Sequence, residues 1–141
     1  MSRIFWDSMM FIYLLEGHPK FGPQVIENLG RSQDRGDVLL TSYLALGEVM
    51  AGGAGNITGA ERARTKIEEM GFSFLPFDGK CVSPFARLRS QMGLKAPDSI
   101  HLACAAAAGV DMYLTGDKQL LNRKLHVPGI QFIAHFGMGV L

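Results

Sequence analysis

The sequence predicts an α/β fold, with a central, mostly parallel sheet of four to five strands covered by helices on both faces. Short apolar segments alternate with helical ones along the chain, in the order β-α-α-β-α-α-β-α-α-β-α-β. Helices placed between strands are typical of parallel sheets, whose strands need long crossover connections. With 141 residues, of which 48% are apolar, the chain is long enough for a single domain, residues 1–141, with a substantial core.

Short apolar runs predict the strands of this sheet. Arg3–Trp6 and Val38–Thr41 are the first two, and Phe72–Phe77 alternates as a half-buried strand does. Met112–Thr115 is the fourth, and Gln131–Ile133 is the candidate for a last strand. In a parallel sheet, the loops that follow these runs all emerge at the same edge.

Helical segments fill the stretches between the strands. Thr58, followed by Glu61, has the capping-box pattern of a helix start. Pro97 suits a first helical turn, because its missing N–H would have no partner there. The predicted helices are Met9–Leu15, Phe21–Arg31, Tyr43–Met50, Thr58 to about Met70, the later half of Asp78–Gln91, Pro97 to Gly109, and Lys118–Leu121.

Composition excludes several classes of protein. The net charge is +1, so charge alone does not indicate a nucleic-acid binder. The apolar run Met9–Leu15 is far shorter than the ~20 residues of a membrane-spanning helix. The first residues carry no signal-peptide pattern, and Cys81 and Cys104 form neither a disulfide framework nor a CxxC motif. We therefore expect a cytoplasmic protein with no membrane segment.

Four of the thirteen acidic residues are predicted to meet at one edge of the sheet. Asp7 follows the first strand and Asp117 follows the fourth. Glu48 lies about two turns into the helix after the second strand, and Asp98 opens the helix that leads to the fourth. Because that helix must run antiparallel to the strand it feeds, its start lies near the end of that strand, next to Asp117. This is the edge at which open α/β sheets hold ligands.

Carboxylates gathered in this way favour a divalent cation. Like charges a few ångströms apart repel each other unless protons or a cation neutralise them. Ligands that are all oxygen suit Mg²⁺ or Mn²⁺, and no His or Cys has the spacing of a zinc site. Such ions promote phosphodiester cleavage. Taken singly, each acid is better explained as a helix cap or turn residue, and Asp98 as a helix-dipole residue, but all four falling at one edge is not.

Basic residues flank the acid-bearing segments. Phosphate contacts dominate the affinity of proteins for nucleic acid, so these side chains are candidates to bind nucleic acid. A solvated helix face explains Arg62, Arg64 and Lys66 instead. His101 lies one turn after Asp98 and fits a catalytic base less well than a histidine packed against its helix. The candidate nucleic-acid contacts are Arg87, Arg89, Lys95 and Lys118, with Arg123 and Lys124 nearby.

Three segments, IFWDSMMFIYLLEG, TSYLALGEVMAG and PDSIHLACAAAAGVDMYLTGDKQL, resemble the PIN-domain nucleases, and most closely the VapC-type toxins of bacterial toxin–antitoxin pairs. The resemblance covers nearly the whole chain and implies a PIN-like, three-layer α/β/α fold. It implies a metal-dependent endoribonuclease, a hydrolase of RNA phosphodiester bonds that is the toxin of a type II pair. By motif, the acids that bind Mg²⁺ or Mn²⁺ are Asp7, Glu48, Asp98 and Asp117, supported by the hydroxyls of Ser8 and Thr115.

The same resemblance implies an RNA substrate, a cognate antitoxin and a homodimer. The chain departs from the family pattern at Gly116, where some members have Asn, and at Lys118 and Gln119, where some carry a further acid. The number of bound metal ions is therefore left open. The alternative is a catalytically inactive PIN-fold module that binds RNA or protein. A phosphatase or receiver domain is disfavoured, because Asp7 is not followed by a second acid.

Overall fold

The computed structural model describes residues 1–52 and 57–138. Its strands form one five-stranded sheet in which every neighbouring pair is parallel, in the order β3-β2-β1-β4-β5. The predicted fold class and the predicted alternation of strands and helices are confirmed. The strands are β1 (Arg3–Trp6), β2 (Val38–Ser42), β3 (Phe72–Leu75), β4 (Val110–Thr115) and β5 (Ile130–His135).

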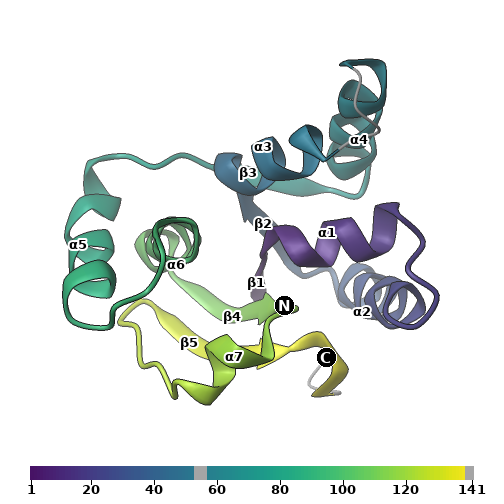
Figure 1. The fold of residues 1–141 in the computed structure, drawn as a ribbon. Helices are drawn as coiled ribbons and strands as arrows, with labels where there is room; N and C mark the ends of the chain where they lie inside the picture. The colour runs from purple at the N-terminus through teal and green to yellow at the C-terminus, as the bar shows by residue number, and fades with distance from the viewer. Residues whose placement is uncertain (53–56, 139–141) are drawn as a thin grey trace.

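The helices form a layer on each face of the sheet. One face is covered by α1 (Ser8–Leu15), α2 (Gly22–Arg35), α3 (Tyr43–Ala51) and α4 (Ile57–Glu69), as Figure 1 shows. The other is covered by α5 (Val82–Ser90) and α6 (Ala96–Ala108), while α7 (Lys118–Asn122) lies beside β5. Short 3-10 turns occupy Gly79–Cys81 and Phe136–Met138. Within the described ranges, no helix is both long and apolar enough to cross a membrane.

Two buried clusters hold these layers together. Successive side chains of a strand point to opposite faces, so Ile4 and Trp6 pack under α1 to α4 while Phe5 packs under α6. The ring of Phe5 stacks on Tyr113 of β4, with centroids 5.0 Å apart. Burial of both faces explains why the strands read as continuous apolar runs.

The structure corrects several predicted element boundaries. Thr58 lies inside α4 rather than at its cap, and the residues just before α4 are outside the described ranges. The third strand ends at Leu75, because Pro76 cannot donate to the ladder. The fourth strand begins two residues earlier than predicted, at Val110, and the last extends to His135.

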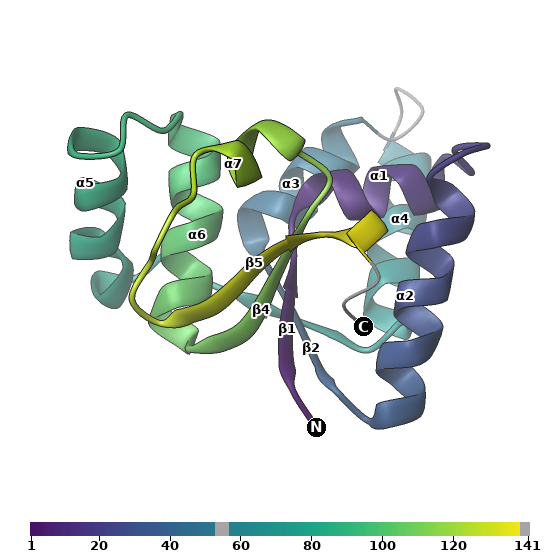
Figure 2. The same ribbon diagram turned by 90° about the horizontal axis from the view of Figure 1, so that it is seen from below.

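The strand order creates a crevice between β1 and β4. The chain passes from β1 to β2 and β3 on one side of the sheet, and then returns to place β4 and β5 on the other. Such a reversal leaves an opening at the carboxyl ends of the two central strands. Figure 2 shows α1 and α7 at this end of the sheet, opposite the N-terminus, with α6 running antiparallel to β4. The crevice therefore lies where the predicted acidic residues emerge.

Candidate functional site

Asp7 lies at the carboxyl end of β1 and caps α1. Its Oδ2 accepts a hydrogen bond of 2.5 Å from the hydroxyl of Thr115, and its Oδ1 accepts one of 3.4 Å from the N–H of Met10. The residue is only 7% exposed, and this burial raises its pKa from 3.8 to about 6, although both hydrogen bonds favour the charged form. An ionised Asp7 is therefore costly unless a cation lies near it.

Thr115 fixes two acids at once, because β4 ends beside β1. Its hydroxyl donates to Asp7 and accepts a hydrogen bond of 2.9 Å from the N–H of Asp117. Asp117 in turn caps α7, its Oδ1 accepting a hydrogen bond of 2.9 Å from the N–H of Gln119. The backbone of Asp117 is thus linked through the Thr115 hydroxyl to the carboxylate of Asp7.

Asp98 faces Asp117 from the first turn of α6. The two carboxylates line the same open hollow at the carboxyl edge of the sheet. Partial burial raises the pKa of Asp98, and the negative charges of Asp117 and, to a lesser degree, Glu48 raise it further. Asp98 is therefore close enough to both acids for their charges to act on it.

Glu48 is anchored by hydrogen bonds from other elements. Its Oε1 lies 2.7 Å from Nε2 of His101 on α6, and the hydroxyl of Ser8 also hydrogen-bonds its carboxylate. The hydrogen bond with His101 is the main reason that the pKa of Glu48 is lowered. Glu48 is thus held in its ionised form on the α3 side of the crevice.

The pKa values of two tyrosines indicate that the four acids lie in one region. Tyr113 is buried below the crevice, and the charges of Asp7, Asp98 and Glu48 add to burial in raising its pKa. Partial burial, followed by the charges of Asp7 and Asp117, raises the pKa of Tyr13 on α1. The structure thus brings together all four acids singled out from the sequence, which we call the acidic cluster: Asp7, Glu48, Asp98 and Asp117.

The acidic cluster is openly spaced and does not form a closed coordination shell. As the side chains lie, no three His, Cys, Asp or Glu residues in the described ranges are near enough to hold a metal ion. The chemistry nevertheless fits a hard divalent ion, because every donor of the cluster is an oxygen. Asp7, Asp98 and Asp117 form no salt bridge with the described residues. The negative charges of Asp117 and Glu48 also raise the pKa of Asp98, which a bound cation would offset.

The basic residues separate into those near the acidic cluster and those away from it. Lys95 and Arg123 line the same hollow as Asp98 and Asp117. Lys118 lies on a neighbouring hollow with Lys20 and His135. The predicted contacts Arg87 and Arg89 are not brought to the cluster: the first lines a hollow beside His126, and the second donates to the carbonyl of Leu94 at 2.8 Å.

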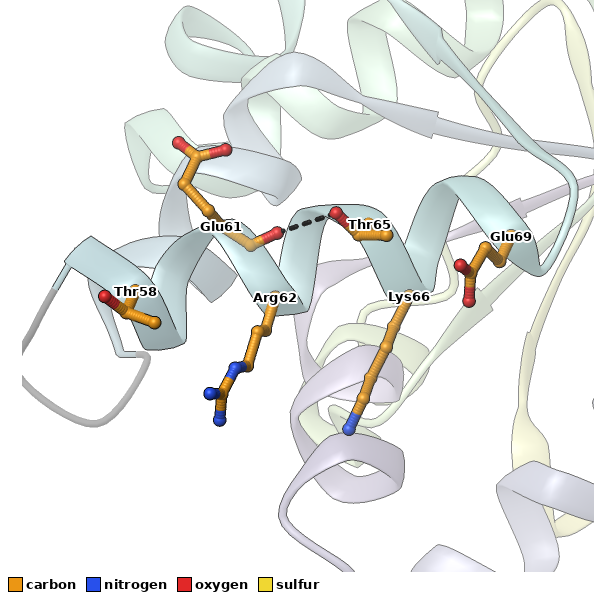
Figure 3. A pocket seen from close by; sticks show the side chains of 6 residues that line it. All are labelled: Thr58, Glu61, Arg62, Thr65, Lys66 and Glu69. Carbon is orange, nitrogen blue, oxygen red and sulfur yellow. Dashed lines mark hydrogen bonds between the residues drawn. The ribbon is translucent and has the colours of Figure 1, made fainter.

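A further surface hollow lies along α4, away from the acidic cluster. Figure 3 shows its lining, in which the hydroxyl of Thr65 donates to the carbonyl of Glu61 at 3.0 Å. Arg62 and Lys66 are exposed there, as the prediction of a solvated helix face requires. Two acids and two bases line the hollow, so the surface has no gathering of one charge. The lining residues are Thr58, Glu61, Arg62, Thr65, Lys66 and Glu69.

Sequence reasoning missed two partners of the acidic cluster. Ser42 ends β2, and its hydroxyl lies 2.8 Å from Nδ1 of His101. His101 was interpreted as a packed histidine, and it is buried, but it also contacts Glu48. The sequence did indicate their position, though not their contacts: His101 lies three residues after Asp98 on the same helix face, and Ser42 ends a strand at the same edge.

The fold and the site together define a class of protein: an α/β protein with an all-parallel sheet and a candidate functional site made of carboxylates at the carboxyl edge of that sheet. The family model of the PIN domain matches residues 4–124, and the chain belongs to the PIN-domain family. The recognition made from the sequence motifs is therefore confirmed. A comparison with curated proteins found no match.

Solved structures of toxin–antitoxin complexes contain chains of the same fold. VapBC2 from Rickettsia felis bound to promoter DNA matches with 17% identity and a TM-score of 0.70, over 94% of this chain and 97% of that one. A toxin–antitoxin complex from Klebsiella pneumoniae matches with 21% identity and a TM-score of 0.66, over 92% and 95%. DNA-bound VapBC from Salmonella typhimurium matches with 17% identity and a TM-score of 0.67, over 96% and 99%. At these identities the likeness establishes the fold.

Proposed function

We propose that this PIN-domain protein is a divalent-metal-dependent endoribonuclease and the toxin of a type II toxin–antitoxin pair. One observation carries the proposal: carboxylates from four separate elements meet at the central crevice, and the most buried of them, Asp7, has a pKa raised to about 6 with no cationic side chain bonded to it. A carboxylate buried at such cost is typical of a functional site.

Each acid has a distinct part in the proposed site. Asp7, Asp98 and Asp117, with Glu48, would hold Mg²⁺ or Mn²⁺, which when bound supplies charge stabilisation at the scissile phosphate and orients the attacking water. Because no three of these side chains stand close enough as they lie, ion binding requires the half-exposed Asp98 and Asp117 to draw together. Thr115 and Ser8 would keep Asp7 and Glu48 oriented meanwhile.

The positive rim of the crevice supports RNA as the substrate. Lys95 and Arg123 line the hollow that contains Asp98 and Asp117, where they could contact phosphates on either side of the cleaved bond. Lys118 presents a further positive charge across α7. Phosphate contacts of this kind bind the backbone without selecting a sequence, so target choice rests on other residues.

The toxin role and its partners rest on the fold neighbours. The structures from Rickettsia felis and Salmonella typhimurium are VapBC complexes bound to DNA, and the one from Klebsiella pneumoniae is a toxin–antitoxin complex. We propose by this likeness that the chain acts in the cytoplasm, pairs with a cognate antitoxin and forms a homodimer. The second candidate is a catalytically inactive PIN module, which the open spacing of the acidic cluster favours.

An RNA cleavage assay separates the two candidates. The purified chain should cut a single-stranded RNA in Mg²⁺ or Mn²⁺, lose the activity in EDTA, and regain it when the metal is restored. Asp98→Asn should lower the rate at least about 100-fold, because that carboxylate is one of the proposed ligands of the metal ion. The matched control Asp34→Asn changes an exposed aspartate of α2 and should leave the rate unaltered. Cleavage that persists in EDTA, or in Asp98→Asn, would contradict the proposal.

A further inference from the structure

His101 links the two helices that carry Glu48 and Asp98. It belongs to α6, is 3% exposed, and reaches across to α3. Nε2 of its ring lies 2.7 Å from Oε1 of Glu48, and Nδ1 lies 2.8 Å from the hydroxyl of Ser42. Both ring nitrogens are therefore engaged by the protein.

The hydrogen bonds at Ser42 are compatible with one continuous series of donors and acceptors from Ala45 to Glu48. Ser42 caps α3, so its oxygen already accepts a hydrogen bond of 3.0 Å from the N–H of Ala45. Its single hydroxyl proton is then free to be donated to Nδ1 of His101. With Nδ1 an acceptor, the ring proton resides on Nε2 and is donated to Glu48. Every donor and acceptor in the series from Ala45 to Glu48 is thereby satisfied.

We infer that His101 is a positioning residue that orients the Glu48 carboxylate for metal binding. This inference rests on the proposed metal-dependent function. The imidazole ring hydrogen-bonds Oε1 of Glu48 and not Oε2. Ser42 anchors the ring from the end of β2. The carboxylate of Glu48 is therefore held in place relative to the sheet, whereas the side chain of a surface glutamate would rotate freely. Hydrogen bonds behind a ligand commonly set its orientation in this way.

The same geometry excludes His101 as the base that touches RNA. Neither ring nitrogen is left to accept a proton from a water or a ribose hydroxyl, and the side chain is buried. Its effect on the reaction passes through Glu48 instead. If His101 acted through packing alone, a substitute would not need a hydrogen-bond donor at the position of Nε2. This difference provides the test.

Two substitutions of His101 separate positioning from packing. His101→Leu fills the space but removes both hydrogen bonds, whereas His101→Gln places an amide N–H near the position of Nε2. Calorimetric titration of Mn²⁺ into each folded variant should give an affinity roughly 10- to 100-fold weaker for His101→Leu, with most of the loss restored in His101→Gln. The control Asn28→Leu removes another buried polar side chain, which bonds Gln24 and Phe136, and should leave Mn²⁺ affinity unaltered.

Each outcome of this titration has a single meaning. Equal Mn²⁺ affinity in His101→Leu and the unaltered chain would overturn the positioning role while leaving the proposed function intact. An equal loss in His101→Gln and His101→Leu, or a loss of the same size in Asn28→Leu, would show that His101 acts only through packing. No Mn²⁺ binding by the unaltered chain at millimolar metal would overturn the proposed function itself, and this inference with it.

Discussion

Replacing Asp7 by asparagine is expected to stabilise the metal-free protein at pH 7 by about 1–3 kcal/mol, while abolishing its stabilisation by Mn²⁺. Burial raises the pKa of Asp7 from 3.8 to about 6 in the folded chain. The folded state therefore binds this proton more tightly than the unfolded state, and the stability gained at low pH is lost as the pH rises through about 6. The difference between a pKa of 3.8 and one of about 6 corresponds to about 3 kcal/mol at most.

Asparagine removes the titration but also alters two hydrogen bonds. Its amide oxygen can still accept from Met10, whereas its amide N–H₂ replaces the oxygen that accepted from Thr115. That rearrangement is the reason for expecting less than the full gain. A buried neutral amide also cannot supply the charge that a divalent ion requires.

Chemical unfolding in EDTA at pH 4 and pH 7, repeated at pH 7 with Mn²⁺, measures both effects. Asp7→Asn should be more stable than the unaltered chain at pH 7, and this advantage should shrink toward pH 4. Added Mn²⁺ should stabilise the unaltered chain and the control but not Asp7→Asn, because an ion stabilises only a folded protein that binds it. Asp34→Asn serves as the control. A pH-independent difference, or equal stabilisation of both proteins by Mn²⁺, would contradict the assignment.

Substituting Gly129 by alanine is expected to destabilise the fold by more than 3 kcal/mol. Gly129 precedes β5 with a φ of +98°, and an added Cβ would lie 2.3 Å from the carbonyl oxygen of Ala106. The carbonyl of Gly129 also accepts the hydrogen bond from Val110 that starts β4, so the loop cannot retreat freely. The added Cβ would clash with the backbone of Ala106, which no change of side-chain rotamer can relieve, so α6 would have to move.

Gly71→Ala provides the matched control for backbone strain. Gly71 has a φ of +94°, close to that of Gly129, but an added Cβ there meets nothing within 4 Å. Its cost should be about 1–2 kcal/mol, the strain of a non-glycine residue in that conformation. Urea unfolding should therefore give a loss at least about 1 kcal/mol larger for Gly129→Ala. Equal losses would mean that α6 does not approach β5 as closely as described.

The parallel sheet was predictable because its strands are buried on both faces. Ile4, Phe5 and Trp6 are all apolar since two separate clusters need them, and helical segments between such runs leave few topologies. Element ends were less predictable. Thr58 and Glu61 satisfy a capping pattern locally, yet α4 begins before them, because spacing alone does not exclude an earlier start.

The residues of the acidic cluster were predictable from the sequence, but the contacts that their side chains make were not. Topology alone brings Asp7 beside Asp117 and turns the start of α6 toward them, whatever the side-chain rotamers. The pairing of His101 with Glu48 depends instead on how closely α6 approaches α3, which no residue spacing encodes. For the same reason, Arg87 is near Asp98 in sequence but lines another hollow, and the guanidinium of Arg89 is engaged by the carbonyl of Leu94.

The central claim is that the acidic cluster is a single divalent-metal site, and diffraction from crystals grown with Mn²⁺ tests it most directly. Anomalous scattering should locate manganese between Asp7, Asp98 and Asp117, with Glu48 beside it and carboxylate oxygens within about 2.0–2.3 Å of the ion. Crystals of Asp98→Asn grown in the same solution should lack the peak or show it strongly reduced. Manganese bound elsewhere on the chain, with the four carboxylates left without an ion, would contradict the account.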